Sequence, residues 1–484
     1  MTAIPVIRTD VQFDPDPRRV IIRPFLPDDR ILPDNALLQR ILAMADSEVA
    51  ATLAAVHARF EDRHLDLEAV LMSHFAFVSD EVSEMPEMSP ARCALLGAYY
   101  THEVSIETAA LTNPSIVPAP DQSGLEPGAL RFILSLRAIG EGHTSSIEFR
   151  CGVIDSSGAI RIEQPSVFAG TGSRNPPLID KSRFMATLVE MDAFDEMVRR
   201  LISGLPDPFE LHDLEAAIAA VDVGQAPRRL SDPSVRAMHL LATSNYETRF
   251  APESKLSERV LFPWSPIESH GMEDARFVRF TADDGSVIYY ATYTAYDGFR
   301  ALPQLIETVD FMAFRIATLA GRFAQNKGAA LFPRRIDGRY AALSRYDTES
   351  NYVMLSDSLW LWEEAEKIES PELPWELKRV GNSGSPLETE AGWLVITHGV
   401  GPLRTYSLGA LLLDINDPCR VIGHLDEPLL VPTDDEREGY VPNVVYSCGS
   451  LIHGNDLVLP FGFSDVASRI AKVPLEALLT RLTE

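Results

Sequence analysis

Residues 271–276, Gly-Met-Glu-Asp-Ala-Arg, place two carboxylates and a guanidinium within four residues. The apolar and aromatic segments 277–280 and 287–293 follow, with turn residues at 283–285 between them, which predicts a strand, a tight turn and a second strand. Acidic groups at the start of a hairpin can project from the end of a sheet into a shared opening. A half-buried carboxyl there, with an arginine two residues on, is suited to general acid catalysis. The alternative is a surface ion pair at a turn.

The composition is that of a large, acidic protein. The chain has 484 residues, which suggests two to four domains or one large repetitive one, and its formal net charge is -27. Such a chain is expected to repel nucleic acid and anionic membranes, so neither is predicted as a partner. An anionic substrate would require a local basic pocket.

The cysteines, histidines and N-terminus exclude several classes of protein. The four cysteines form no CxxC pair and the histidines are scattered, so we expect reduced thiols and no metal. The Asp283-Asp284-Gly285 segment resembles the start of a calcium loop, but its ligand spacing does not continue, which favours a turn. No signal peptide and no membrane span of about 18 apolar residues is expected, and we predict a cytoplasmic protein.

Two regions are predicted to be helical. In the first, residues 1–109, apolar positions recur at helical spacing from about residue 34 to 110. The second is an insertion at about 170–235, where proline residues separate two helical patterns. The first region makes a homo-oligomer plausible.

The remaining chain reads as short strands separated by turns. Residues 131–138, 146–154 and 159–162 form one meander, and about four similar units follow after the insertion. Turns every eight to twelve residues are typical of a propeller blade or a sandwich. We therefore predict a mainly β fold with a weak structural repeat.

Several of these segments together resemble glycoside hydrolase family 130, the β-mannoside phosphorylases and related β-mannosidases. The resemblance covers about residues 110–480. It rests on residues 113–115, 136–138, 271–276, 294–298, 326–333, 392–394, 398–400, 437–443 and 462–465. It implies a five-bladed β-propeller over residues 110–484, with the active site in its central funnel.

The resemblance implies that Asp274 is the general acid. In this family the acid is thought to pass its proton through a substrate hydroxyl to the glycosidic oxygen, while inorganic phosphate attacks the anomeric carbon. The product would be α-mannose 1-phosphate, formed with inversion. Phosphate needs no base, whereas a hydrolase would need a second carboxylate to activate water. Burial and Glu273 are expected to keep Asp274 protonated, so Arg276 should face another partner, either Glu273 or a neighbouring blade.

Lys327 and His398 match phosphate-binding positions of the family, and Arg345 is a further candidate. A cationic cluster is required to hold a dianion in so acidic a protein. The alternatives are a surface lysine for Lys327 and a core histidine for His398.

One position departs from the family pattern. The phosphorylases carry another phosphate-binding arginine between the segments at 294–298 and 326–333. In residues 299–308 of this chain, no arginine aligns with that position of the family. Arg300 or Arg315 could substitute. Glu307 in the same region could activate water, which would favour a hydrolase.

The sugar pocket is predicted from matching positions. Amide, carboxylate and guanidinium groups suit vicinal hydroxyls, and tyrosine offers a flat face. The predicted substrate-binding residues are Asn113, Arg137, Tyr296, Asp297, Asp465 and Glu273. Asp297-Gly298 could instead be only a turn.

The leading hypothesis is an inverting phosphorylase of β-mannoside oligosaccharides, with phosphate as co-substrate and no cofactor. The first rival is a β-mannosidase on the same scaffold. The second rival is a propeller that binds glycans without turning them over.

Overall fold

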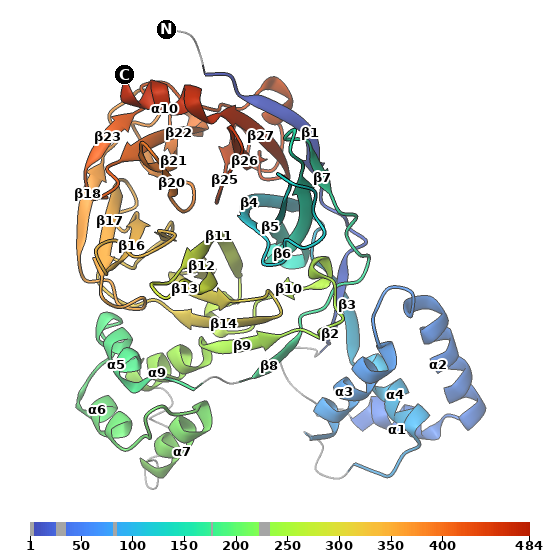
Figure 1. The fold of residues 1–484 in the computed structure, drawn as a ribbon. Helices are drawn as coiled ribbons and strands as arrows, with labels where there is room; N and C mark the ends of the chain where they lie inside the picture. The colour runs from blue at the N-terminus through green and yellow to red at the C-terminus, as the bar shows by residue number, and fades with distance from the viewer. Residues whose placement is uncertain (1–3, 26–34, 81–84, 176–177, 222–232) are drawn as a thin grey trace.

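The computed structural model describes residues 4–25, 35–80, 85–175, 178–221 and 233–484. Its main body is built of antiparallel strands that fall into five successive groups around a common centre (Figure 1). The prediction of a mainly β protein is confirmed.

We call these groups sheet units 1 to 5. Unit 1 contains β4 (Ala110–Pro118), β5 (Leu130–Ile139), β6 (Ser145–Ile154) and β7 (Ile160–Ile162). Unit 2 contains β11 (Gly271–Thr281), β12 (Val287–Tyr296), β13 (Ala301–Thr308) and β14 (Ala313–Thr318), extended by β9 (Tyr246–Arg249) and β8 (Ser173–Asn175). Unit 3 contains β15 (Ala330–Leu331), β16 (Tyr340–Ser344), β17 (Asn351–Ser356) and β18 (Ala365–Glu369). Unit 4 contains β19 (Arg379–Asn382), β21 (Gly392–Val400), β22 (Tyr406–Leu413) and β23 (Val421–His424). Unit 5 contains β24 (Val445–Tyr446), β26 (Asp456–Phe463), β27 (Ala467–Pro474) and β1 (Ile7–Phe13).

Short strands extend these units. β10 (Val260–Leu261) pairs with β6, β20 (Leu387–Thr389) with β21, and β25 (Leu451–His453) with β26. β2 (Val20–Pro24) and β3 (Thr101–Ser105) form a separate pair. Units 1 and 2 are joined where Gly271 pairs with Ser145, so they count as one larger sheet.

The first strand of the chain belongs to the last sheet unit. β1 pairs antiparallel with β27, which places both ends of the chain in unit 5 (Figure 1). The sequence analysis assigned this segment to a helical region and missed the strand. The reason is its position at an outer edge, where most of its residues are exposed or half-buried and no apolar face is required.

The described helices lie mainly in two groups. α1 (Asn35–Ala43), α2 (Asp46–Phe60), α3 (Leu67–Asp80) and α4 (Pro90–Tyr99) pack around their own apolar core. The insertion contains α5 (Lys181–Glu190), α6 (Glu196–Ser203), α7 (Leu211–Val221) and α9 (Pro233–Thr243), again with its own core, and α10 (Leu475–Thr483) follows β27. The insertion therefore runs past the predicted limit of 235, and its residues 222–232 lie outside the described part.

Within the described ranges, no single helix has the length and apolarity to cross a membrane. Residues 36–43 and 46–60 meet the length and composition criteria only when taken together, and they are bent by 111°.

A buried ion network fastens the N-terminal segment to unit 1. Arg19 lies 2.6 Å from Glu107 and 2.6 Å from Glu148, and its guanidinium also donates to the carbonyl oxygens of Ser166 and Ser257. Arg19, Glu107 and Glu148 are all at most 2% exposed. Arg150 pairs with the same two side chains, so removing Arg19 leaves two buried acidic groups with one cation between them, which costs more than the pair itself contributes.

Arg19→Ala is therefore expected to lower the free energy of unfolding by about 3–5 kcal/mol, because two buried carboxylates lose a partner. The matched control is Arg18→Ala, whose side chain is 79% exposed and pairs only with Asp16 at the surface. Urea unfolding followed by circular dichroism measures both variants. Equal effects of the two substitutions would contradict a stabilising role for the buried network.

Candidate active site

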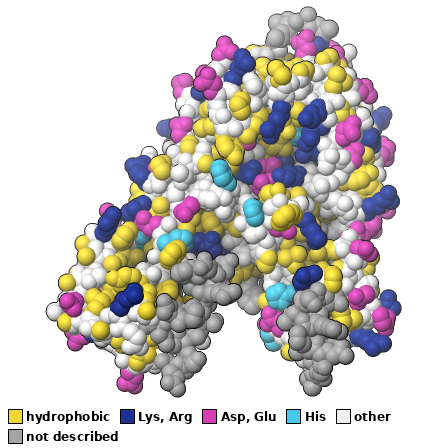
Figure 2. All heavy atoms as spheres, turned by 180° about the vertical axis from the view of Figure 1, so that it is seen from behind, with side chains coloured by type: hydrophobic (Ala, Val, Ile, Leu, Met, Phe, Trp, Pro, Cys, Tyr) yellow, Lys and Arg dark blue, Asp and Glu magenta, His cyan; other side chains and the backbone are white. Residues whose placement is uncertain are grey.

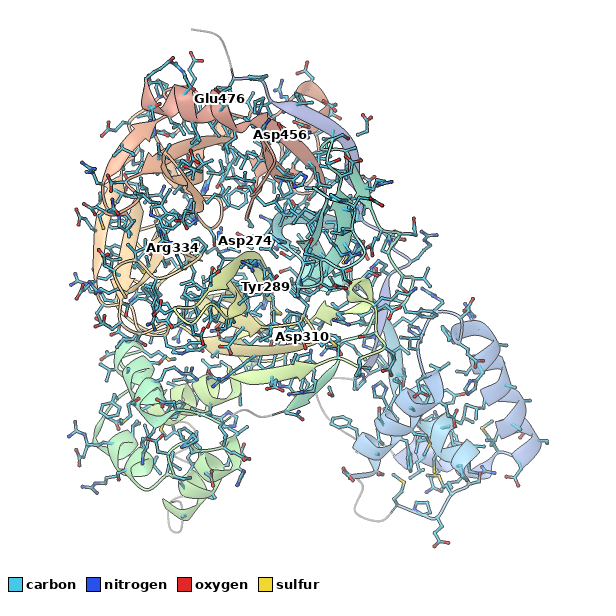
Figure 3. The ribbon with its side chains drawn as sticks, viewed as in Figure 1. Asp274, Tyr289, Asp310, Arg334, Asp456 and Glu476 are labelled. Atoms are coloured by element: carbon cyan, nitrogen blue, oxygen red, sulfur yellow. The ribbon has the colours of Figure 1, made fainter. Side chains whose placement is uncertain are left out.

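Two β-bulges direct polar side chains toward the common centre of the five sheet units. In β11 the pairing with β12 shifts between Glu273 and Arg276, and Asp274 within the bulge has φ 57°. In β4 the pairing with β5 shifts between Thr112 and Ser115, and Asn113 there has φ 49°. Aspartate and asparagine tolerate this left-handed conformation better than other non-glycine residues. The same backbone device thus occurs in the first two units, and Asp274 lies close to the common centre (Figure 3).

These side chains meet in a cavity of about 300 Å³. Figure 2 shows a face of the molecule on which Lys and Arg side chains gather around a recess that also contains acidic ones. The lining residues of the cavity are Asn113, Arg137, Asp274, Lys327, Arg345, Arg379, His398, Arg404, Tyr406, Val441, Val444, Tyr446 and Asp465. Five of them are cationic and two are carboxylic acids, so the cavity is locally basic in a chain of net charge -27.

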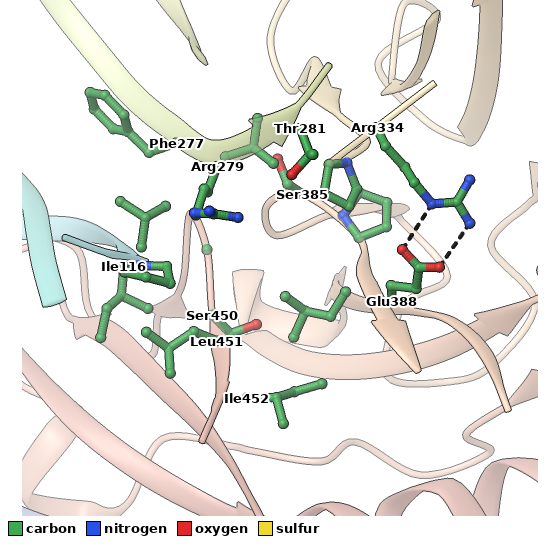
Figure 4. Close-up of a pocket in the computed structure, with 17 residues that line it drawn as sticks. Ile116, Phe277, Arg279, Thr281, Arg334, Ser385, Glu388, Ser450, Leu451 and Ile452 are labelled. Carbon is green, nitrogen blue, oxygen red and sulfur yellow. Dashed lines mark hydrogen bonds and ion pairs between the residues drawn. The ribbon is translucent and has the colours of Figure 1, made fainter. Parts of the chain in front are cut away.

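A second hollow of similar size lies at the other end of the same inner strands (Figure 4). Its lining of described residues is largely apolar and includes one carboxylate, Glu388, which is paired with Arg334 at 2.8 Å. This arrangement offers no proton donor, so the basic cavity is the candidate active site.

Glu273 and Asp274 have different partners. The Glu273 carboxylate accepts hydrogen bonds from Arg137, at 2.7 Å, and from Lys327. The Asp274 Oδ1 is buried, lies 3.6 Å from Arg137 Nη1, and accepts no hydrogen bond from the described residues. Glu273 therefore positions two cations, while Asp274 keeps an oxygen available to a ligand.

Arg276 of unit 2 is held by Tyr446 of unit 5, which is not adjacent to unit 2, so neither of the two predicted partners is the one observed. One Arg276 nitrogen donates to the Tyr446 hydroxyl at 2.9 Å, and another donates to the backbone oxygen of Asp274 at 2.9 Å. The Arg276 guanidinium still lies 4.0 Å from the Asp274 carboxylate.

The expectation that Asp274 is protonated in the resting site was wrong. Burial raises the pKa of Asp274, but the positive charges of Arg137, Arg276, Lys327 and Arg345 outweigh burial, and the net pKa lies below its usual value. The predicted repulsion from Glu273 does not decide the balance, because Glu273 is itself paired with two cations.

The other carboxyl in the cavity behaves in the opposite way. Burial is the largest cause that raises the pKa of Asp465, and the charges of Asp274 and Glu273 act in the same direction against Arg137 and Arg404. The two carboxyls of one cavity are thus held at different pKa values, a pattern that accompanies acid–base catalysis.

His398 is neutral and buried, and its ring is hydrogen-bonded to Arg345 of the cavity lining. Arg345 Nη1 lies 2.8 Å from His398 Nε2. Since arginine only donates, Nε2 accepts, and the ring proton must be on Nδ1, 3.4 Å from Ser383 Oγ. Burial and the charges of nearby arginines, Arg345 first among them, hold the pKa of His398 well below its ordinary value. His398 thus orients Arg345 rather than adding a positive charge.

Besides Glu273, five residues proposed from the sequence lie away from the cavity lining. Tyr296 lies next to it, with Lys327 Nζ 5.6 Å from its ring, but its hydroxyl donates to Gly298. The Asp297 carboxylate caps its own turn by accepting from the backbone of Phe299 and Arg300, as the alternative interpretation held. Glu307 lies on β13 beside Arg315 of β14, so neither supplies a base or a phosphate ligand to the cavity. Arg300 is exposed and also lies outside the lining.

The sequence analysis missed Arg379, Arg404, Tyr406 and Tyr446. Arg379 begins β19, and Arg404 ends a short turn between β21 and β22, both in unit 4. That turn corresponds to the one at Glu141–His143 between β5 and β6 of unit 1.

Comparison with known proteins identifies the family. Residues 244–484 match the glycoside hydrolase family 130 model described as beta-1,4-mannooligosaccharide phosphorylase. The 1,2-beta-oligomannan phosphorylase of Thermoanaerobacter sp. is 34% identical over 226 residues, which cover 45% of this chain and 73% of that protein. The chain belongs to glycoside hydrolase family 130. This confirms the predicted family and the prediction of an enzyme.

Two further relatives share lower identity with the chain. A beta-1,2-mannobiose phosphorylase of Listeria innocua is 29% identical over 239 residues, 46% of this chain and 63% of that protein. A solved structure of beta-1,2-mannobiose phosphorylase from Listeria innocua, in complex with beta-1,2-mannobiose, covers 78% of this chain and 93% of its own, with a TM-score of 0.46 and 18% identity. The family model begins after the insertion, so Asn113 and Arg137 of unit 1 lie outside it.

The neutral state of His398 gives a testable prediction. Because its pKa lies well below the ordinary value, we expect the ring to remain neutral at pH 6, with the proton on Nδ1. Nitrogen-15 NMR of histidine-labelled protein measures this, and the His398→Gln spectrum identifies the signal. A charged ring at pH 6, or a neutral ring protonated at Nε2, would contradict the hydrogen bond from Arg345.

Proposed function

We propose that this enzyme is an inverting β-mannoside phosphorylase built on a five-bladed β-propeller, in which each sheet unit is one blade. The observation that carries the proposal is the lining of the cavity. A single buried carboxyl with an unpartnered oxygen, Asp274, lies among five cationic side chains. A neutral sugar alone needs no such excess of positive charge, whereas a phosphate dianion does.

In this proposal the lining residues divide into a group that binds phosphate and a group that binds the sugar. Lys327, Arg345 and Arg379 bind the phosphate, and His398 fixes Arg345 through its Nε2. Asn113, Arg137 and Asp465 bind the mannosyl unit beside Asp274. Arg379 and Arg404 line the cavity, whereas Arg300 does not, so the departure from the family pattern does not leave the phosphate site short of arginines.

In this proposal the ionised state of Asp274 in the free enzyme has a function. An ionised carboxylate cannot donate a proton, and the cations hold it ionised. A bound phosphate dianion offsets those cations and adds like charge near Asp274, and both effects raise the pKa of the carboxyl. With phosphate bound, Asp274 would take up a proton from solvent and become an acid, so proton donation would be coupled to the presence of the nucleophile.

The reaction follows from this arrangement. A phosphate oxygen attacks the anomeric carbon from the face opposite the leaving oxygen, and the glycosidic bond breaks as the leaving oxygen receives the proton from Asp274, directly or through a substrate hydroxyl. The products are α-mannose 1-phosphate and the shortened mannoside. No base is needed, because phosphate is already a nucleophile.

Hydrolysis is the second candidate, and Asp465 is the observation that favours it. An inverting hydrolase needs two carboxyls in one cavity, one as acid and one as base for water, and Asp465 lines the same cavity as Asp274. The five cations favour phosphate over water as the nucleophile.

Product analysis separates the candidates. The enzyme is incubated with β-1,2- or β-1,4-mannobiose, with and without phosphate. Mannose 1-phosphate formed only with phosphate supports the proposal. Free mannose at a rate independent of phosphate would identify a hydrolase, and no turnover of either mannobiose or of longer β-mannosides would contradict catalysis on this substrate class.

Asp274→Asn is expected to reduce kcat by about 10²–10⁴-fold, since a positioned general acid contributes that much. Asparagine tolerates the left-handed backbone at this position, so the fold and the thermal midpoint should be retained. The control is Asp283→Asn, at the exposed turn that follows β11. If Asp274→Asn retained more than a tenth of wild-type kcat, Asp274 would not be the proton donor.

A further inference from the structure

A second group of ionisable side chains lies outside the catalytic cavity. Glu369 ends β18 of unit 3, His424 ends β23 of unit 4, and Glu376 lies in the segment between these units. One ligand atom from each of the three residues lies within 4.8 Å of the others. His424 Nε2 is 3.0 Å from Glu369 Oε1.

The group has more acceptors than donors. Glu376 is only 1% exposed, and its Oε2 is buried with no hydrogen-bond partner among the described residues. Its Oε1 receives only two long hydrogen bonds, at 3.4 and 3.3 Å, from the backbone of Glu372 and Leu373. Asn351, which is fully buried, donates its side-chain amide to Glu369, and its own Oδ1 is buried without a partner.

Burial of an unpaired carboxylate oxygen is costly unless a donor or a cation compensates for it. Here two carboxylates converge on one imidazole, whose Nε2 is engaged by Glu369, and the buried Glu376 Oε2 receives no donor from the described residues. A cation held between the three side chains would satisfy the unpartnered Glu376 oxygen and would remove the repulsion between the two carboxylates.

We infer that Glu369, Glu376 and His424 bind a divalent transition-metal ion such as Zn²⁺ or Mn²⁺. Two carboxylates and one imidazole provide three protein ligands, and a nitrogen ligand favours these ions over Ca²⁺ and Mg²⁺. The His424 side chain is 29% exposed, so an ion can enter from solvent and water can complete its coordination.

The position of the site assigns the ion a structural role. It would join units 3 and 4 at their outer strands and fix the segment that connects them. That segment leads into Arg379 of the catalytic cavity, whose backbone N–H donates to the Glu376 backbone oxygen at 2.9 Å. The sequence analysis expected no metal, because His424 is far from Glu369 and Glu376 along the chain and only the packing of two units brings it to them.

Metal content tests the inference directly. Chelator-treated wild type, Glu376→Gln and His424→Ala are dialysed against Zn²⁺ or Mn²⁺, and bound metal is measured by mass spectrometry. Glu427→Gln is the matched control, because it removes one exposed carboxylate three residues from His424. The two ligand variants are expected to bind one equivalent less than wild type and the control.

Thermal unfolding provides a second readout. Zn²⁺ should raise the midpoint of wild type and of Glu427→Gln but not that of either ligand variant, because an ion that binds only the folded state stabilises it. His424→Ala changes the most exposed ligand, so it keeps the test open if Glu376→Gln fails to fold. Equal metal content in all four proteins, or the absence of bound metal in wild type, would overturn the inference.

Discussion

Around the Asp274 carboxyl there is more positive than negative charge, and the chemistry of the site depends on this imbalance. Arg137, Arg276, Lys327 and Arg345 together lower its pKa although burial acts in the opposite direction. A carboxylate in this state is a poor acid by itself. The same cations make the cavity attractive to a dianion in a protein of net charge -27, so the groups that hold the acid ionised are also those that would bind the nucleophile.

The backbone conformation of two bulges and two turns positions the side chains that line the cavity. The bulges at Asn113 and Asp274 direct side chains from strands that would otherwise alternate between the two faces of a sheet. Other residues with left-handed backbone conformation, Arg404 and Asp465, lie in turns of units 4 and 5 and line the same cavity. Such conformations cost free energy, and their concentration around one cavity is typical of functional sites.

The sequence predicted those parts of the fold that depend on local pattern. Strands with a buried face and turns rich in glycine and aspartate were recognised, whereas β1 was missed because an exposed edge strand needs no apolar pattern. In the site, Asp274 and Lys327 were found through the family resemblance, Arg345 was named as a further candidate, and all three lie in one cavity. The pKa of Asp274 could not be predicted from its neighbours in sequence, because three of the four cations that lower it come from other units or from the connections between them. Arg379 was missed for the same reason.

The pKa of Asp274 with and without phosphate is the most direct test of this account. Carbon-13 NMR of aspartate labelled at the carboxyl carbon, with the Asp274→Asn spectrum for assignment, follows the carboxyl as pH is varied. The account predicts that the pKa lies below its ordinary value in the free enzyme and rises when phosphate binds. A pKa that does not change with phosphate, or that falls, would contradict the coupling of proton donation to phosphate binding.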